Sequence, residues 1–130
     1  MVNIKKNHDL GLLLLRIAIG AVFIAHGWGK FAQMDGTIAF FATIGFPAII
    51  AYLVAAVELL GGVALVIGLW TDLVTLLFSI VMVVAIVYVK MGKFGLGFVD
   101  GYEFDLVLLA GSLPVMFVGP GKYTALKGKM

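Results

Sequence analysis

The sequence predicts an all-α integral membrane protein, a four-helix transmembrane bundle formed by residues 1–130 as one domain. Composition is the first reason. Hydrophobic residues make up 63% of the chain and charged residues 12%, whereas soluble domains average about 50% and 25%. A small domain exposes too much surface to water for so few polar residues to cover it. The second reason is that the apolar residues gather in four long runs.

The four apolar runs lie near residues 10–30, 48–70, 73–89 and 104–118. A helix of about 20 residues crosses the hydrocarbon core of a bilayer, so each run is a candidate span. A backbone inside hydrocarbon must satisfy its own hydrogen bonds, which makes helices the expected structure of all four. The fourth run is the shortest and contains Pro114, which removes one helical hydrogen bond.

The connections between the runs differ in kind. The stretch AQMDGTIAFFATIGFP predicts a short interfacial helix between the first two spans, because DGT at 35–37 resembles a helix start and apolar residues follow at helical spacing. Only Thr71 and Asp72 separate the second and third runs, so these runs form an antiparallel hairpin. The glycine-rich segment 90–103 is expected to be a loop.

Lysine placement predicts the orientation. With four spans, both termini share one side of the membrane, and cytoplasmic loops are usually the richer in Lys and Arg. The lysines are Lys5, Lys6, Lys122, Lys127 and Lys129 on the side of the termini and Lys30, Lys90 and Lys93 on the other. We therefore expect a multi-pass protein of the cytoplasmic membrane with both termini in the cytoplasm.

Arg16 and Glu58 lie deep inside the first and second runs, and His26 lies nearer the outer end of the first. A charge at the bilayer centre costs about 2.5–3.5 kcal/mol, so such groups normally face the bundle interior and find partners. At a rise of about 1.5 Å per residue, Arg16 lies about 6 Å to the cytoplasmic side of the midplane, close to the depth of Glu58. Arg16 is therefore the predicted bidentate partner of Glu58.

Glycines flank this predicted pair on both helices and permit close approach of the two backbones. The predicted packing residues are Gly20, Gly27, Gly61 and Gly62. Two interpretations of the pair stay open. One is a lock that holds two helices in register. The other is a ligand or proton site, since ionisable groups inside membranes usually serve function.

His26, Lys30 and Glu103 form a second candidate cluster, near the outer face. His26 and Lys30 are four residues apart on one helix face and suit two hydrogen bonds to a ketone or quinone oxygen. Glu103 stands at the start of the fourth helix, as an N-terminal charge or as a partner of Lys30. The alternative is an ordinary interfacial belt of aromatic residues with solvated charges.

Several kinds of site are absent from the sequence. There is no cysteine, which excludes disulfides, thiol redox chemistry and thiolate metal sites in this chain. No nucleotide, haem or metal motif occurs, and no basic patch suits nucleic acid. Any redox chemistry would need a bound cofactor or a partner protein.

Five blocks, in this order and spacing, carry a resemblance to a known family: LLLRIAIGAVFIAHGWGKF, FFATIGFP, AAVELLGGVALVIGLWT, GYEFDLVLLAG and VGPGKYTAL. The chain resembles the DoxX family of small bacterial membrane proteins along nearly its whole length. The resemblance implies a four-helix bundle in the bacterial inner membrane. Positions that match the family's pattern are Arg16, Gly20, His26, Gly27, Lys30, Glu58, Gly61, Gly62 and Glu103. The family's common Ser-Leu-Asp near the C-terminus is absent here.

The resemblance also implies a function, because DoxX relatives are described as subunits of thiosulfate:quinone oxidoreductase and of other membrane oxidoreductase complexes. It points to a subunit of, or accessory to, a quinone-linked oxidoreductase, with a quinone held inside the bundle. The implied site has Arg16 and Glu58 at its floor and His26, Lys30 and Glu103 at its mouth. The alternatives are a non-enzymatic anchoring or assembly protein and a small proton-coupled exporter. Implied partners are lipid, a redox protein and a second copy of the chain.

Overall fold

The computed structural model describes residues 5–125 and is all-helical over that range, which confirms the predicted fold class. Five α-helices and two π-helical segments follow one another. They are α1 (His8–Ala32), α2 (Met34–Thr43), α3 (Ala48–Ile67), α4 (Thr71–Val83), η1 (Val84–Lys93), η2 (Phe98–Tyr102) and α5 (Glu103–Val118). Lys127 and Lys129, two of the lysines behind the predicted orientation, lie outside the described residues.

Four helical stretches are long and apolar enough to cross a membrane: His8–Ala32, Ala48–Ile67, Thr71–Lys93 and Phe98–Val118. The last two are longer than predicted. The loop expected over 90–103 is shorter, because η1 continues the helix of α4 to Lys93; residues 94–97 are not helical, and the backbone of η2 is kinked at Val99 and Asp100 before α5 begins. The chain is therefore a multi-pass membrane protein whose third connection is much shorter than its glycine content suggested.

The predicted interfacial helix is present as α2, which begins at Met34 and ends at Thr43. It contacts α1 and α3 but is too short to cross a membrane. Gly45 follows with a φ of 93°, a left-handed conformation that glycine adopts without steric cost. Pro47 then precedes the first turn of α3. These two residues turn the chain from the surface-lying helix into the second span.

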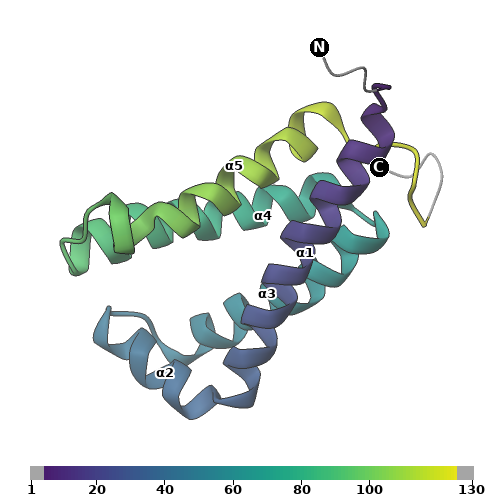
Figure 1. Cartoon of the computed structure of the whole chain (residues 1–130). Helices are drawn as coiled ribbons and strands as arrows, with labels where there is room; N and C mark the ends of the chain where they lie inside the picture. Colours follow the sequence, from purple (N-terminus) through teal and green to yellow (C-terminus); the bar gives the residue numbers. More distant parts are fainter. Residues whose placement is uncertain (1–4, 126–130) are drawn as a thin grey trace.

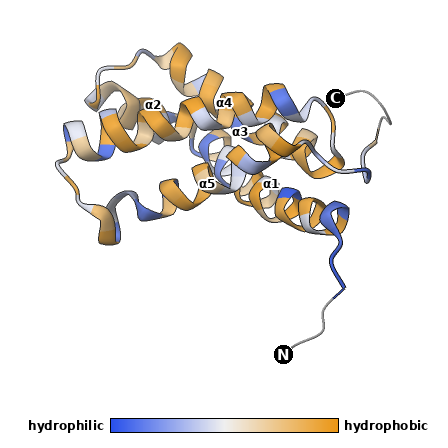
Figure 2. Cartoon of the chain, turned by 90° about the horizontal axis from the view of Figure 1, so that it is seen from above, coloured by the Kyte–Doolittle hydropathy of each residue, from blue (hydrophilic) through white to orange (hydrophobic). Residues whose placement is uncertain are grey.

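Two pairs of helices make up the bundle, α1 crossing α3 and α4 lying beside α5 (Figure 1). Both termini lie at one end, whereas α2 and the connection from η1 to α5 lie at the other, toward which the pairs diverge (Figure 1). Hydrophobic residues run along all the helices (Figure 2), and outward-facing side chains such as Leu14, Leu60 and Val107 are more than half exposed. Such an apolar exterior implies contact with lipid.

Helices α1 and α3 can cross this closely because glycines, which have no side chain, lie where the two backbones meet. A Cβ atom on Gly27 would lie 2.4 Å from the backbone nitrogen of Leu59, and one on Gly20 would lie 2.8 Å from the carbonyl oxygen of Gly62. Gly61, predicted on the same face, instead faces Phe78 of α4, whose ring a Cβ would approach to 2.8 Å. The contacts of Gly20 and Gly27 fix which residues of the two helices lie opposite each other.

Candidate functional site

The predicted ion pair between Arg16 and Glu58 is wrong. The buried guanidinium of Arg16 donates hydrogen bonds to backbone carbonyls instead, from Nε to Leu65, from Nη2 to Val66 and from Nη1 to Pro120, each at 2.9 Å. Carbonyls in the last turn of a helix have no partner within the helix and lie at the negative end of its dipole. Arg16 therefore closes the C-terminal end of α3 and ties the segment after α5 to it.

The register of α1 against α3 explains the error. Since Gly20 meets Gly62 and Gly27 meets Leu59, the antiparallel helices place Arg16 beside the last turn of α3. Glu58 lies seven residues before Leu65, about 10 Å along the helix axis. The sequence-based estimate of depth measured each residue from the middle of its own run and ignored this register.

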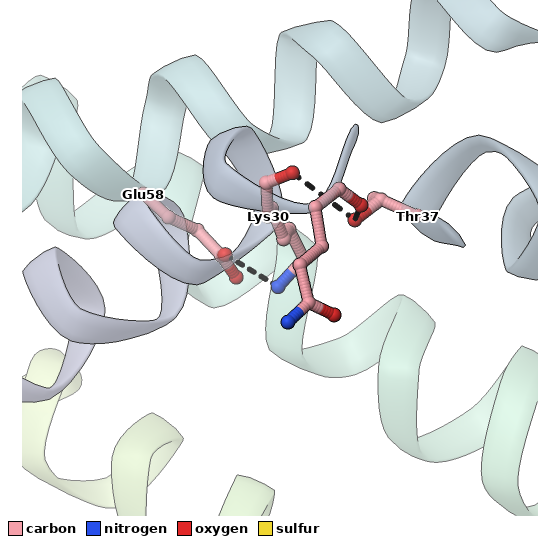
Figure 3. A network of polar contacts seen from close by, with 4 residues as sticks. Lys30, Thr37 and Glu58 are labelled. Carbon is pink, nitrogen blue, oxygen red and sulfur yellow. Dashed lines mark hydrogen bonds and ion pairs between the residues drawn. The ribbon is translucent and has the colours of Figure 1, made fainter. Parts of the chain in front are cut away.

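Glu58 pairs with Lys30. The Lys30 Nζ and Glu58 Oε1 atoms are 2.7 Å apart, and the side chains are 24% and 5% exposed (Figure 3). Lys30 lies in the last turn of α1, and its carbonyl accepts a hydrogen bond of 3.2 Å from the hydroxyl of Thr37 on α2 (Figure 3). The ion pair thus joins α1 to α3, and the Thr37 hydrogen bond adds α2, at the end of the bundle opposite the start of α1.

A second ion pair, which the sequence did not predict, joins the other two helices. Lys90 Nζ of η1 lies 2.6 Å from Asp105 Oδ2 of α5 and donates a hydrogen bond of 3.2 Å to the carbonyl of Gly101. Asp105 is buried and Lys90 is partly exposed. A carboxylate at this depth, inside an apolar helix, is retained only with a partner, which Lys90 supplies.

Both ion pairs line one cavity of about 450 Å³. All five α-helices and η1 contribute to its wall, which is mostly aromatic and aliphatic. The lining residues are Phe23, His26, Lys30, Phe40, Phe41, Ile44, Phe46, Ile50, Val54, Glu58, Ile80, Val81, Met82, Val84, Ala85, Val89, Lys90, Phe104, Asp105 and Leu108. The cavity is within the usual range for small-molecule sites, about 300–1,000 Å³. It combines an apolar interior with two fixed ammonium–carboxylate pairs.

Three of the five predicted site residues line this cavity and two do not. Glu58, His26 and Lys30 line the cavity, and the His26 ring lies 5.7 Å from the ring of Phe104. Arg16 and Glu103 do not line it. The predicted option of an ion pair between Glu103 and Lys30 is also wrong, because Lys30 pairs with Glu58. Residues two apart on a helix point to different faces, so Asp105 rather than Glu103 supplies the acid of α5.

Beside the cavity, α2 and the segment that follows it contact the end of the third span. The Tyr88 hydroxyl of η1 donates a hydrogen bond of 3.0 Å to the carbonyl of Ile44, and its ring lies 5.3 Å from that of Phe46. Phe40 of α2 stacks on Phe94 with centroids 6.0 Å apart. The Tyr88 hydrogen bond and these aromatic contacts therefore connect the region of α2 to the end of the third span.

Replacing Tyr88 by phenylalanine should lower stability slightly. The change removes one partly buried hydrogen bond while keeping the ring, so we expect a loss of about 0.5–1.5 kcal/mol in unfolding free energy. Denaturant titration in detergent measures it. Tyr52→Phe is the matched control, because Tyr52 on α3 is 47% exposed and donates no hydrogen bond to the described residues. Equal stability of the two variants would show that the Tyr88 bond contributes nothing.

The comparison with known families is decisive for classification. The DoxX family model matches residues 11–91, more than half of the chain. The chain belongs to the DoxX family. The match covers α1 to most of η1 and so includes Lys30, Glu58 and Lys90. Asp105, the partner of Lys90, lies beyond it.

Named relatives of this DoxX protein come from three bacteria. It is 42% identical over 115 residues to "Putative oxidoreductase CatD" of Bacillus subtilis, covering 88% of this chain and 84% of that protein. It is 32% identical over 122 residues to "Inner membrane protein YqjF" of Escherichia coli, covering 92% of each. An uncharacterised protein of Haemophilus influenzae is 29% identical over 126 residues, covering 93% of this chain and 90% of that protein. No solved structure matches the chain.

Proposed function

We propose that this DoxX protein is a membrane subunit of, or accessory to, a quinone-linked oxidoreductase, and that it binds a quinone-like lipophilic molecule in the cavity between its helices. The supporting observation is the cavity itself, where apolar walls surround the Lys30–Glu58 and Lys90–Asp105 pairs. The name of the Bacillus subtilis relative, "Putative oxidoreductase CatD", agrees with this proposal.

The donor set suits a quinone. A quinone ring is flat and apolar, with carbonyl oxygens at its edge that accept hydrogen bonds. Aromatic side chains such as Phe41 and Phe104 offer the ring contact surfaces, and the lysine ammonium groups offer the oxygens charge-assisted hydrogen bonds. On reduction, a bound quinone takes up two electrons and two protons. The carboxylates of Glu58 and Asp105 line the cavity and can accept hydrogen bonds from the hydroxyl groups of the reduced form.

The accessory role follows from the sequence. The chain has no cysteine and no haem or nucleotide motif, so a partner protein is the proposed source or acceptor of electrons. We also propose that the termini lie in the cytoplasm and the cavity toward the outer face, since five of the eight lysines lie outside the spans on the side of the termini. A quinone dissolved in the bilayer and a redox protein at the membrane surface are thus the proposed partners.

The two alternatives have less support. An anchoring protein held together by an Arg16–Glu58 pair loses its basis, because Arg16 binds carbonyls and Glu58 binds Lys30. A cation exporter needs a free acid in the cavity, whereas both acids here are paired with lysines, whose positive charge disfavours a cationic substrate.

Binding of 1,4-naphthoquinone to the purified protein in lipid nanodiscs tests the proposal. We expect saturable binding above the partitioning into empty nanodiscs. Val54→Phe adds a ring to the cavity wall and should weaken binding at least tenfold, since the ring occupies the space of the ligand. Equilibrium dialysis measures both affinities.

Leu60→Phe provides the matched control. Leu60 lies on the same helix as Val54 but is 67% exposed on the outside of the bundle, so this variant should bind like the unmodified protein. Binding no greater than that of empty nanodiscs would refute the proposed quinone site.

A further inference from the structure

We propose that Lys90 and Asp105 form a second ligand anchor opposite Lys30 and Glu58, so that the cavity selects flat apolar molecules with polar oxygens at two opposite edges, such as para-quinones. This inference rests on the proposed function and specifies its ligand. A single anchor would accept any lipophilic ketone, whereas two anchors on different walls require two oxygens.

The two ion pairs come from different parts of the bundle. Lys30 and Glu58 belong to the crossing pair α1 and α3, whereas Lys90 and Asp105 belong to η1 and α5, which lie together on the other side (Figure 1). Both pairs nevertheless line the same cavity. A ligand within it therefore meets a polar group on each of two walls, and aromatic rings elsewhere in the lining.

Each lysine retains hydrogen-bonding capacity. An ammonium group has three N–H donors. Among the described residues, Lys30 donates one hydrogen bond, to Glu58, and Lys90 donates one, to the carbonyl of Gly101, while its ammonium group lies 2.6 Å from Asp105 Oδ2. At least one N–H of each lysine is thus available to a carbonyl oxygen. The adjacent carboxylates accept hydrogen bonds, so each wall can also hold the hydroxyl of a hydroquinone.

Structural need alone does not explain the second pair. Taking a lysine and an aspartate out of water costs several kcal/mol per ion, and a pair of apolar residues usually packs two helices at least as well. Lys90 also lies in a π-helix, an uncommon conformation that is frequent at functional sites. Both features are expected of a group retained to contact a ligand.

A comparison of two probes tests the second anchor. 1,4-Naphthoquinone carries two carbonyl oxygens and 1-tetralone carries one on a similar fused-ring skeleton. A hydrogen bond to a charged donor strengthens binding by roughly tenfold or more. After correction for partitioning into empty nanodiscs, we expect naphthoquinone to bind at least tenfold more tightly.

The double variant Lys90→Met/Asp105→Leu removes both charges together. The ratio of naphthoquinone affinity to tetralone affinity should then fall to about one, while tetralone binding stays unchanged. Lys93→Met is the matched control, because Lys93 lies on the same element but not in the cavity wall, and it should keep the full ratio. If the double variant does not fold, Lys90→Gln replaces it. A neutral donor bonds about half as strongly as a charged one, so the ratio should then fall to about threefold.

The outcomes separate the two proposals. If the unmodified protein binds neither probe, the proposed function fails. If it binds both probes equally, or if the ratio survives in the Lys90 variants, the second anchor is refuted while the quinone-like site remains. A ratio that falls in the Lys90 variants and not in Lys93→Met establishes the anchor.

Discussion

Replacing Arg16 by methionine should destabilise the protein by about 3–5 kcal/mol. The variant leaves three carbonyls, of Leu65, Val66 and Pro120, without their donor in a region that water does not reach easily. Each buried carbonyl left unsatisfied costs about 1–3 kcal/mol, and partial rearrangement of the chain recovers some of the sum. Denaturant titration in detergent, compared with the unmodified protein, measures the loss.

Trypsin cleavage provides an independent readout of the same variant. The segment after α5 is held by Arg16 and by a hydrogen bond of 3.0 Å from the backbone nitrogen of Lys122 to Asp9 Oδ1. Loss of Arg16 should expose the bond after Lys122 to faster cleavage, because local opening precedes proteolysis. Cleavage after Lys93, at the opposite end of the bundle, serves as the internal reference and should not change.

Arg16→Lys distinguishes the contribution of the positive charge from that of the planar guanidinium group. A lysine keeps the positive charge at the end of α3 but cannot reach three carbonyls with a planar fork, so its stability should lie between those of methionine and arginine. Equal stability of the arginine and methionine proteins would contradict the role of Arg16 as a link between α3 and the C-terminal segment.

The four spans and α2 could be predicted because long apolar runs and helix start signals are local features of the sequence. The partner of Arg16 could not, because it depends on the register of two helices that are far apart in sequence. The glycines at the crossing determine this register. Matching Gly20 to Gly62 and Gly27 to Leu59 places Arg16 near Leu65, but a sequence does not state which glycine meets which residue.

Lys90 and Asp105 were missed for a related reason. Both stand near the ends of apolar runs, where a charge normally reaches water, so the sequence predicts solvated groups. In the structure η1 continues the helix of α4 as far as Lys93, and Lys90 and Asp105 come together at the cavity. Asp105 precedes a strongly apolar stretch, LVLLAG, and this was the available signal that it lies deeper than Glu103.

Gly27→Ala should be strongly destabilising although it adds only a methyl group. The new Cβ would lie 2.4 Å from the backbone nitrogen of Leu59 and 2.8 Å from its Cα, and backbone atoms cannot rotate away as a side chain can. Helices α1 and α3 must separate to accommodate it. Overpacking typically costs about 1–3 kcal/mol and more where the backbone itself must move. Denaturant titration in detergent measures the effect.

Gly29→Ala is the matched control, since a Cβ there meets nothing within 4 Å. Alanine is the better helix former by about 1 kcal/mol, so this variant should be as stable as the unmodified protein or more so. A similar loss in both variants would attribute the effect to the helix itself and not to the crossing.

The separation of α1 and α3 in Gly27→Ala should also change the cavity. Lys30 lies three residues after Gly27, and Glu58 is adjacent to Leu59, so separating the helices at Gly27 pulls the ends of the 2.7 Å ion pair apart. Gly27→Ala should therefore weaken naphthoquinone binding even at temperatures where the protein stays folded, and Gly29→Ala should not. Gly68→Ala would strain the bundle near Arg16, at the far end of α3, and should lower stability without this loss of binding. The contrast would show that the crossing at Gly27 positions the Lys30–Glu58 wall of the site.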